Sequence, residues 1–136
     1  MKSTLFVLIV AMVAALAGCG GVKRDADVKS FIADIDQMAL DISRAVDEKP
    51  ETGVDRAQQL LEKRKPELKA KFENLKDLRG YQISEGTTKE FSDAVARNVE
   101  KVGNLRIKYA EESSENERLA QKLTKLADDF DSIFGV

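Results

Sequence analysis

The 136-residue sequence has no histidine, no tryptophan and only one cysteine. Without histidine, the chain cannot build a serine–histidine or cysteine–histidine nucleophile pair. It also cannot build the Glu-x-x-His motif of di-iron bundles or a histidine-ligated haem. The lone cysteine has no partner thiol for redox chemistry and too few ligands around it for the usual zinc sites. We therefore expect a non-enzymatic protein with no catalytic residues, no cofactor and no metal ion.

Acidic residues are numerous, but their spacing indicates no cation site. The densest cluster, Asp128, Asp129 and Asp131, lacks the glycine and the terminal glutamate of a calcium loop. Paired carboxylates of the glycosidase kind need a cleft, which a narrow helical bundle seldom provides. We interpret the cluster as part of a solvated helix face.

Proline and aromatic residues are also scarce, with two prolines and 6% aromatics, whereas charged residues make up 34% of the chain. The sequence is rich in alanine, leucine, lysine and glutamate, which is typical of helices. Strand-like alternation does not extend beyond a few residues. The composition therefore predicts an all-α fold.

The first 18 residues have the three parts of a secretory signal. Lys2 gives a positive start, Leu5 to Ala15 form an apolar run of eleven residues, and small residues follow. A transmembrane helix needs about 20 apolar residues, so this run is too short for a comfortable span. The pattern predicts a signal peptide over residues 1–18.

The segment Leu16-Ala17-Gly18-Cys19 resembles the lipobox of bacterial lipoproteins. This resemblance covers only the leader. It implies that the Cys19 thiol receives a diacylglycerol, that a signal peptidase cuts between Gly18 and Cys19, and that the new amino group is acylated. The alternative is an incidental cysteine in a plain signal or anchor helix.

The residues after Cys19 bear on where the protein resides. Gly20 follows the cysteine instead of the aspartate that typically retains lipoproteins in the inner membrane, so the resemblance favours the periplasmic face of the outer membrane in a Gram-negative host. Residues 19–24 form a lipidated cysteine with a short tether. The five residues Gly20–Arg24 span at most about 20 Å, which keeps Lys23 and Arg24 near the lipid headgroups.

Cleavage would leave residues 19–136, enough for one domain over residues 25–136. Of the charges, 24 acidic residues and all but one of the 22 basic residues lie in this part, because Lys2 belongs to the leader. The resulting net charge of −3 gives no indication of a nucleic-acid partner. The expected partners are membrane lipid, through the acyl anchor, and a protein that the sequence does not identify.

Apolar residues at spacings of three and four predict the first two helices, over residues 25–48 and 53–79. Thr52 and Asp55 resemble a capping box that starts the second helix. Pro66 is expected to kink or split it, and Gly80 is expected to end it.

A third helix is predicted to start at a capping box of Thr87 and Glu90. Gly103 lies inside it and weakens it by about 1 kcal/mol relative to alanine, and a close helix approach would be one reason for a glycine there. A turn within residues 111–118, capped by Ser114 and Glu117, would give a fourth helix and an up-down four-helix bundle. The alternative is three long helices with a continuous C-terminal helix. Tyr81 and Ile83 are expected to plug one end.

One basic stretch interrupts the pattern of mixed charge. It is compatible with contact to anionic lipid, peptidoglycan or an acidic partner, or with pairing to the acidic fourth helix. We favour an ordinary solvated face. Its residues are Lys63, Arg64, Lys65, Lys69 and Lys71.

These observations favour a membrane-anchored envelope lipoprotein with a structural or protein-interaction role. The alternative is a small immunity or inhibitor protein directed against an envelope-targeting toxin or hydrolase.

The first testable prediction is that the domain folds without its anchor. The apolar stripes lie within residues 25–134, whereas the leader does not share their pattern. A protein that begins at Val22 should therefore give a mainly helical circular dichroism spectrum. A largely disordered spectrum would show that the helices need a partner to fold.

Overall fold

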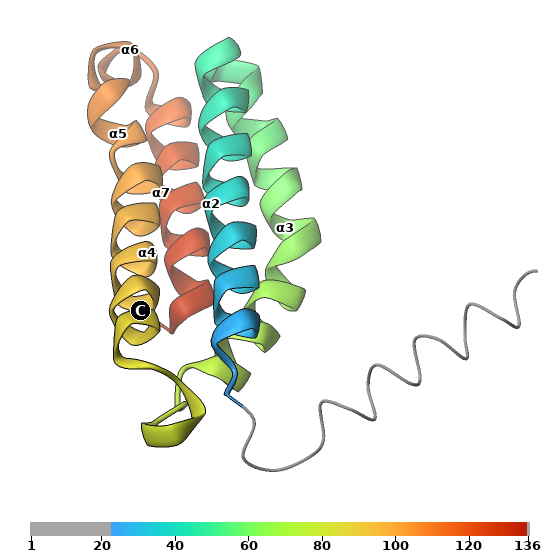
Figure 1. The fold of residues 1–136 in the computed structure, drawn as a ribbon. Coiled ribbons are helices and arrows are strands. Elements are labelled where there is room, and N and C mark those ends of the chain that lie inside the picture. The colour runs from blue at the N-terminus through green and yellow to red at the C-terminus, as the bar shows by residue number, and fades with distance from the viewer. Residues whose placement is uncertain (1–22, 136) are drawn as a thin grey trace, which may run out of the picture.

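The computed structural model describes residues 23–135, and every element in that range is helical. Its four long helices are α2 (Asp25–Glu48), α3 (Pro50–Leu75), α4 (Glu85–Gly103) and α7 (Glu117–Asp131). They pack side by side in one bundle (Figure 1). The prediction of an all-α helical bundle is confirmed.

The chain between α4 and α7 is broken at several points, so the alternative of a continuous C-terminal helix is wrong. Two short helices lie there, α5 (Leu105–Lys108) and α6 (Ala110–Ser114). The turn falls within the predicted range, but Ser114 does not cap α7. The side chain of Asn116 instead accepts a hydrogen bond from the amide of Leu119 at 3.1 Å.

The order of the helices around the bundle is α2, α3, α7, α4. Helix α2 packs against α3 and α4, and α7 packs against the same two helices from the other side. Consecutive helices α3 and α4 are therefore diagonal to each other. The connection between them, residues 76–84, crosses the end of the bundle, and α2 and α4 run parallel (Figure 1).

Three aspartates of α2 hold it in register with α4 and with α5, the short helix that follows, along what we call the α2–α4 seam. Asp25 accepts hydrogen bonds from Ser84, Asp36 from Arg97 and Asn98, and Asp47 from Lys108 and Tyr109. The partners lie at the start of α4, within α4 and at the end of α5, so the bonds fall at the beginning, middle and end of α2. The aspartates are eleven residues apart, close to three turns at about 3.6 residues per turn, so they lie on one face.

The electrostatics of the α2–α4 seam favour ionised aspartates. Burial disfavours the charge of Asp36, but hydrogen bonds from Arg97 and Asn98 outweigh it and leave the pKa of Asp36 below its usual range. Hydrogen bonds from Lys108 and Tyr109 also lower the pKa of Asp47. Both carboxyl groups are therefore negative at neutral pH, when they attract Arg97 of α4 and Lys108 of α5 most strongly.

Helix α3 differs from its prediction at both ends. It begins three residues early, at Pro50, because a proline fits the first turn, where its missing N–H has no helical partner. It ends at Leu75 and not near Arg79, because the chain turns there into the crossover. Pro66 does not split the helix, which continues through it, although α3 is bowed in Figure 1.

The close approach of two helices occurs at Gly53 and not at Gly103. A Cβ atom at Gly53 would lie 1.8 Å from the carbonyl oxygen of Ala45 in α2. Only Lys49 separates α2 from α3, so their backbones must nearly touch next to the turn. A Cβ atom at Gly103 would meet only the flexible Arg106 guanidinium, at 3.9 Å, and this glycine ends α4.

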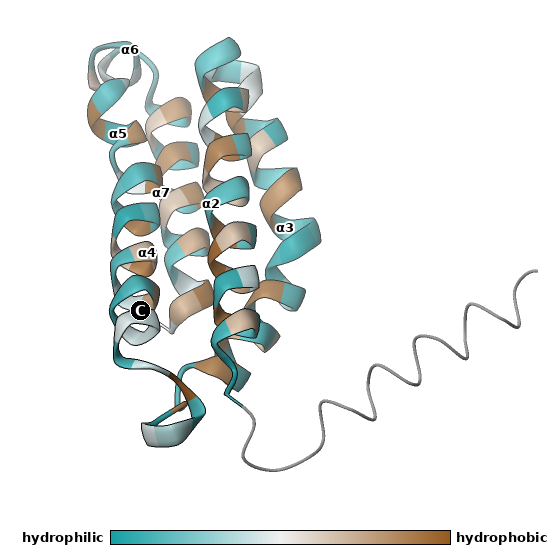
Figure 2. Ribbon diagram, viewed as in Figure 1, coloured by the Kyte–Doolittle hydropathy of each residue, from teal (hydrophilic) through white to brown (hydrophobic). Residues whose placement is uncertain are grey.

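Phenylalanines from all parts of the bundle form one aromatic cluster in the core. Phe72 of α3 lies at its centre, with ring centroids 6.2 Å from Phe31, 5.9 Å from Phe91 and 5.3 Å from Phe134. The ring centroids of Phe130 and Phe134 are 5.6 Å apart. Phe134 belongs to a final turn, η2 (Ser132–Phe134). Apolar and polar residues alternate along each helix in Figure 2, as burial of one face requires.

The contact at Gly53 generates a stability prediction. Gly53→Ala should destabilise the protein by about 1–3 kcal/mol, because the new methyl group meets backbone that has nowhere to move. Gly86→Ala is the matched control. Gly86 is helical with no atom near a Cβ, so that change should stabilise the protein by about 0.4–1 kcal/mol. Urea unfolding measures both. Equal stability of the Gly53→Ala variant and the wild type would contradict the close approach.

Candidate functional site

The candidate site is the end of the bundle from which the N-terminal segment leaves. We call it the tether end and define it as residues 23–25 and 76–86. Gly18 and Cys19, the predicted cleavage and lipidation residues, lie outside the described residues. Lys23 is exposed directly before α2. The tether end is therefore the part of the bundle nearest to the predicted anchor.

Arg24 is bonded to the folded bundle at the tether end. Its backbone amide donates a hydrogen bond to the carbonyl of Gln82 at 2.6 Å. Its guanidinium pairs with Asp27 at 2.9 Å. The tether thus enters the fold at a fixed point on the crossover, and Lys23 is the more exposed of the two basic residues expected at a membrane surface.

Asp25 and Ser84 join the start of α2 to the start of α4. The Asp25 carboxylate accepts hydrogen bonds from both the amide and the hydroxyl of Ser84 at 2.9 Å. Ser84 caps α4 by accepting a bond from the amide of Thr87 at 3.3 Å. The predicted Thr87–Glu90 capping box is therefore wrong, because the helix begins three residues earlier and Thr87 is buried within it.

The hydrogen bonds at Asp25 also control its charge. The backbone N–H of Ser84 is the main cause that lowers the pKa of Asp25, and the hydroxyls of Thr87 and Ser84 lower it further. The carboxylate is therefore fully ionised at neutral pH. Sequence reasoning missed this link, and a serine three residues before Thr87 was the available signal for it.

The crossover closes the bundle with two residues and exposes a third. Leu78 and Ile83 are buried against the core, which confirms that Ile83 is a plug. The same expectation for Tyr81 is wrong, because its side chain is 72% exposed. Tyr81 lies in a 3-10 turn, η1 (Gly80–Gln82), whose first residue has a positive φ of 57° that suits glycine.

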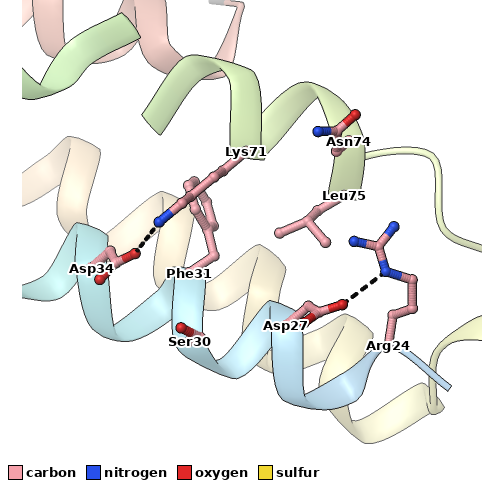
Figure 3. Close-up of a pocket in the computed structure, with 8 residues that line it drawn as sticks. All are labelled: Arg24, Asp27, Ser30, Phe31, Asp34, Lys71, Asn74 and Leu75. Carbon is pink, nitrogen blue, oxygen red and sulfur yellow. Dashed lines mark hydrogen bonds and ion pairs between the residues drawn. The ribbon is translucent and has the colours of Figure 1, made fainter. Parts of the chain in front are cut away.

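A groove of about 190 Å³ lies beside the tether end, between α2 and α3. Figure 3 shows Arg24 paired with Asp27 on one side of it and Lys71 with Asp34 on the other. Hydrogen bonds to Glu67 and Asp34 raise the pKa of Lys71, so this cation stays charged. Each charged group that lines the groove is already neutralised by a neighbour. The groove is therefore better suited to polar surface contact than to holding a charged ligand.

The basic stretch and the acidic cluster are partly brought together. Lys65 lies 3.8 Å from Asp129, which also accepts bonds from Lys125 and Gln58 at 2.6 Å. Lys71 pairs with α2 instead. Burial raises the pKa of Asp131. Within residues 23–135, no group of three or more potential ligands could hold a metal ion.

Two further findings concern the chain as a whole. No helix among the described residues is long and apolar enough to cross a membrane. No protein-family model matches the chain, and neither does any curated protein or solved structure.

The Asp25–Ser84 link can be tested by Ser84→Ala. The loss of the cap should cost about 0.5–2 kcal/mol of stability. In an NMR titration the pKa of Asp25 should move upward toward its usual value, because one of its hydrogen-bond donors is gone. Thr88→Ala is the control, since the Thr88 hydroxyl donates to the Ser84 carbonyl and makes no hydrogen bond to Asp25.

The sign of the pH dependence follows from the lowered pKa. The bonds between Asp25 and Ser84 are at full strength above about pH 4, and they are lost as the pH falls through the lower pKa of the folded state. An Asp25 pKa that is identical in the wild type and the Ser84→Ala variant would contradict this link.

Proposed function

We propose that this protein is a lipoprotein of the bacterial envelope whose helical bundle has a non-enzymatic structural or protein-interaction role. The observation that carries the proposal is Leu16-Ala17-Gly18-Cys19, at the end of an apolar leader and separated by five residues from the start of α2 at Asp25. Acylated Cys19 would hold the domain to the membrane, with the periplasmic face of the outer membrane favoured in a Gram-negative host.

The fold of the bundle supports this proposal in one respect. Helix α2 starts at Asp25, so almost no chain separates the predicted anchor from folded structure. Arg24 is hydrogen-bonded to the crossover, which directs the anchor to one end of the bundle. A domain tethered in this way stays next to its bilayer and offers its helical sides to neighbouring envelope components.

The alternative, an inhibitor of an envelope-targeting enzyme or toxin, would use the same anchor. It requires a tight protein interface, which commonly buries a cluster of exposed aromatic or apolar residues. Within residues 23–135, the exposed large apolar side chains are Leu60, Tyr81 and Ile107, and Tyr81 and Ile107 lie at opposite ends of the bundle. Such scattered residues favour the structural or interaction role over the inhibitor role.

Cys19→Ser tests the proposal directly. The variant lacks the thiol that accepts the diacylglycerol, so it should incorporate no labelled fatty acid and should accumulate as the uncleaved precursor. Gly21→Ala is the control, because it leaves the lipobox intact and should be acylated normally. Metabolic labelling of cells followed by capture of the protein measures both.

Two outcomes would count against an anchor at Cys19. Label that persists on the Cys19→Ser variant would place the acyl group elsewhere. Equal absence of label from the wild type, the control and the variant would show that the leader is an ordinary signal.

A further inference from the structure

We propose that the crossover at the tether end is a bilayer-contacting surface, with Tyr81 at the headgroup level of an anionic phospholipid membrane. The inference rests on the proposed anchor at Cys19, and it adds a contact surface and an orientation. The bundle would stand on its tether end, with α5 and α6 away from the lipid.

Tyr81 is 72% exposed, although it belongs to a segment whose other apolar residues, Leu78 and Ile83, are buried. Tyrosine has an apolar ring and a polar hydroxyl, which makes it one of the two residues enriched at membrane–water interfaces. The exposed ring of Tyr81 does not contribute to the packing of the bundle.

Tyr81 lies next to the point where the N-terminal segment enters the bundle. The Arg24 amide is bonded to the carbonyl of Gln82, the residue next to Tyr81, at 2.6 Å. The five residues from Gly20 to Arg24 span at most about 20 Å, so Tyr81 lies within a short distance of the predicted acyl chains. The 24 residues of α2 extend about 36 Å in the opposite direction.

The two ends of the bundle also differ in charge. The tether end has four basic residues against three acidic ones, with Asp25 turned inward to Ser84, although Arg24 pairs with Asp27 and Lys76 with Glu73. The opposite end, residues 48–51 and 104–117, has three basic residues against six acidic ones. An anionic surface therefore repels the far end more strongly than the tether end. The basic residues of the tether end are Lys23, Arg24, Lys76 and Arg79.

Hydrogen bonds hold the turn around Tyr81 in place without any contact with lipid. The Arg79 guanidinium donates hydrogen bonds to the carbonyls of Lys76 and Leu78 at 3.1 and 2.8 Å. The side chain of Gln82 accepts a bond from the Arg79 amide at 3.4 Å. Because these bonds hold the turn around Tyr81, contact with lipid costs little further conformational entropy.

The absence of tryptophan makes a clean experiment possible. Tyr81→Trp places a single fluorophore in the proposed contact. Ile107→Trp is the matched control, because Ile107 is 74% exposed and lies beside Lys108, whose partner Asp47 is at the far end of α2. Each variant is purified as the full lipidated protein and reconstituted into vesicles of phosphatidylethanolamine and phosphatidylglycerol. Circular dichroism verifies that each variant is folded.

Quenching by spin-labelled lipids and by aqueous acrylamide then gives opposite readouts. The Tyr81→Trp protein should lose most of its fluorescence to the spin-labelled lipid, show a blue-shifted emission and resist acrylamide. The Ile107→Trp protein should keep its fluorescence with the lipid quencher and lose it to acrylamide. This pair of results would support the contact and the upright orientation.

The other outcomes overturn the inference in distinguishable ways. An acylated Tyr81→Trp protein that the lipid does not quench overturns the contact and leaves the anchor intact. Equal lipid quenching of both variants shows a bundle that lies along the membrane. A mass spectrum without an acyl group on Cys19 overturns the proposed function, and the inference with it.

Discussion

The parallel pairing of α2 and α4 is the constraint on which the rest of the structure depends. Helices α2 and α4 are separated in sequence by α3. They can be parallel neighbours in this four-helix bundle only because residues 76–84 cross its end. The α2–α4 seam keeps α2 in register with α4 and α5 through aspartates at eleven-residue intervals. As a result, the starts of both helices, the crossover and the tether meet at one end.

Packing and polar bonding contribute in different places. The aromatic cluster around Phe72 joins the helices near the tether end, where burial of large rings contributes most per residue. At the other end, the missing side chain of Gly53 allows α3 to touch the backbone of Ala45 in α2 next to a one-residue turn. Asn98, only 3% exposed, satisfies both amide protons with Asp36 and the Ala94 carbonyl, so its burial carries no unpaired donor.

Sequence periodicity was sufficient to predict the helices but not their neighbours. The bounds of α2 were predicted to the residue, because its apolar stripe is uninterrupted. The starts of α3, α4 and α7 were misplaced, because several plausible caps lie within a few residues and tertiary contacts select among them. Gly53 differs from Gly103 only through the backbone it faces, which no local pattern reveals. At the site, Ile83 followed from hydrophobicity, whereas the exposure of Tyr81 depends on the path of the crossover.

The helix arrangement also has a consequence for the order in which the chain folds. Because only Lys49 joins α2 to α3, their contacts are the most local ones between long helices, and we expect this hairpin to form before α4 and α7 dock. The two flanks that later receive α4 and α7 are bordered by charged side chains, including Asp36, Asp47, Asp55 and Glu62. These charges keep the borders of the α2–α3 hairpin hydrated. They also make the hairpins of two different molecules repel each other. We therefore expect the same residues that register the finished bundle to disfavour association of its first half with another copy.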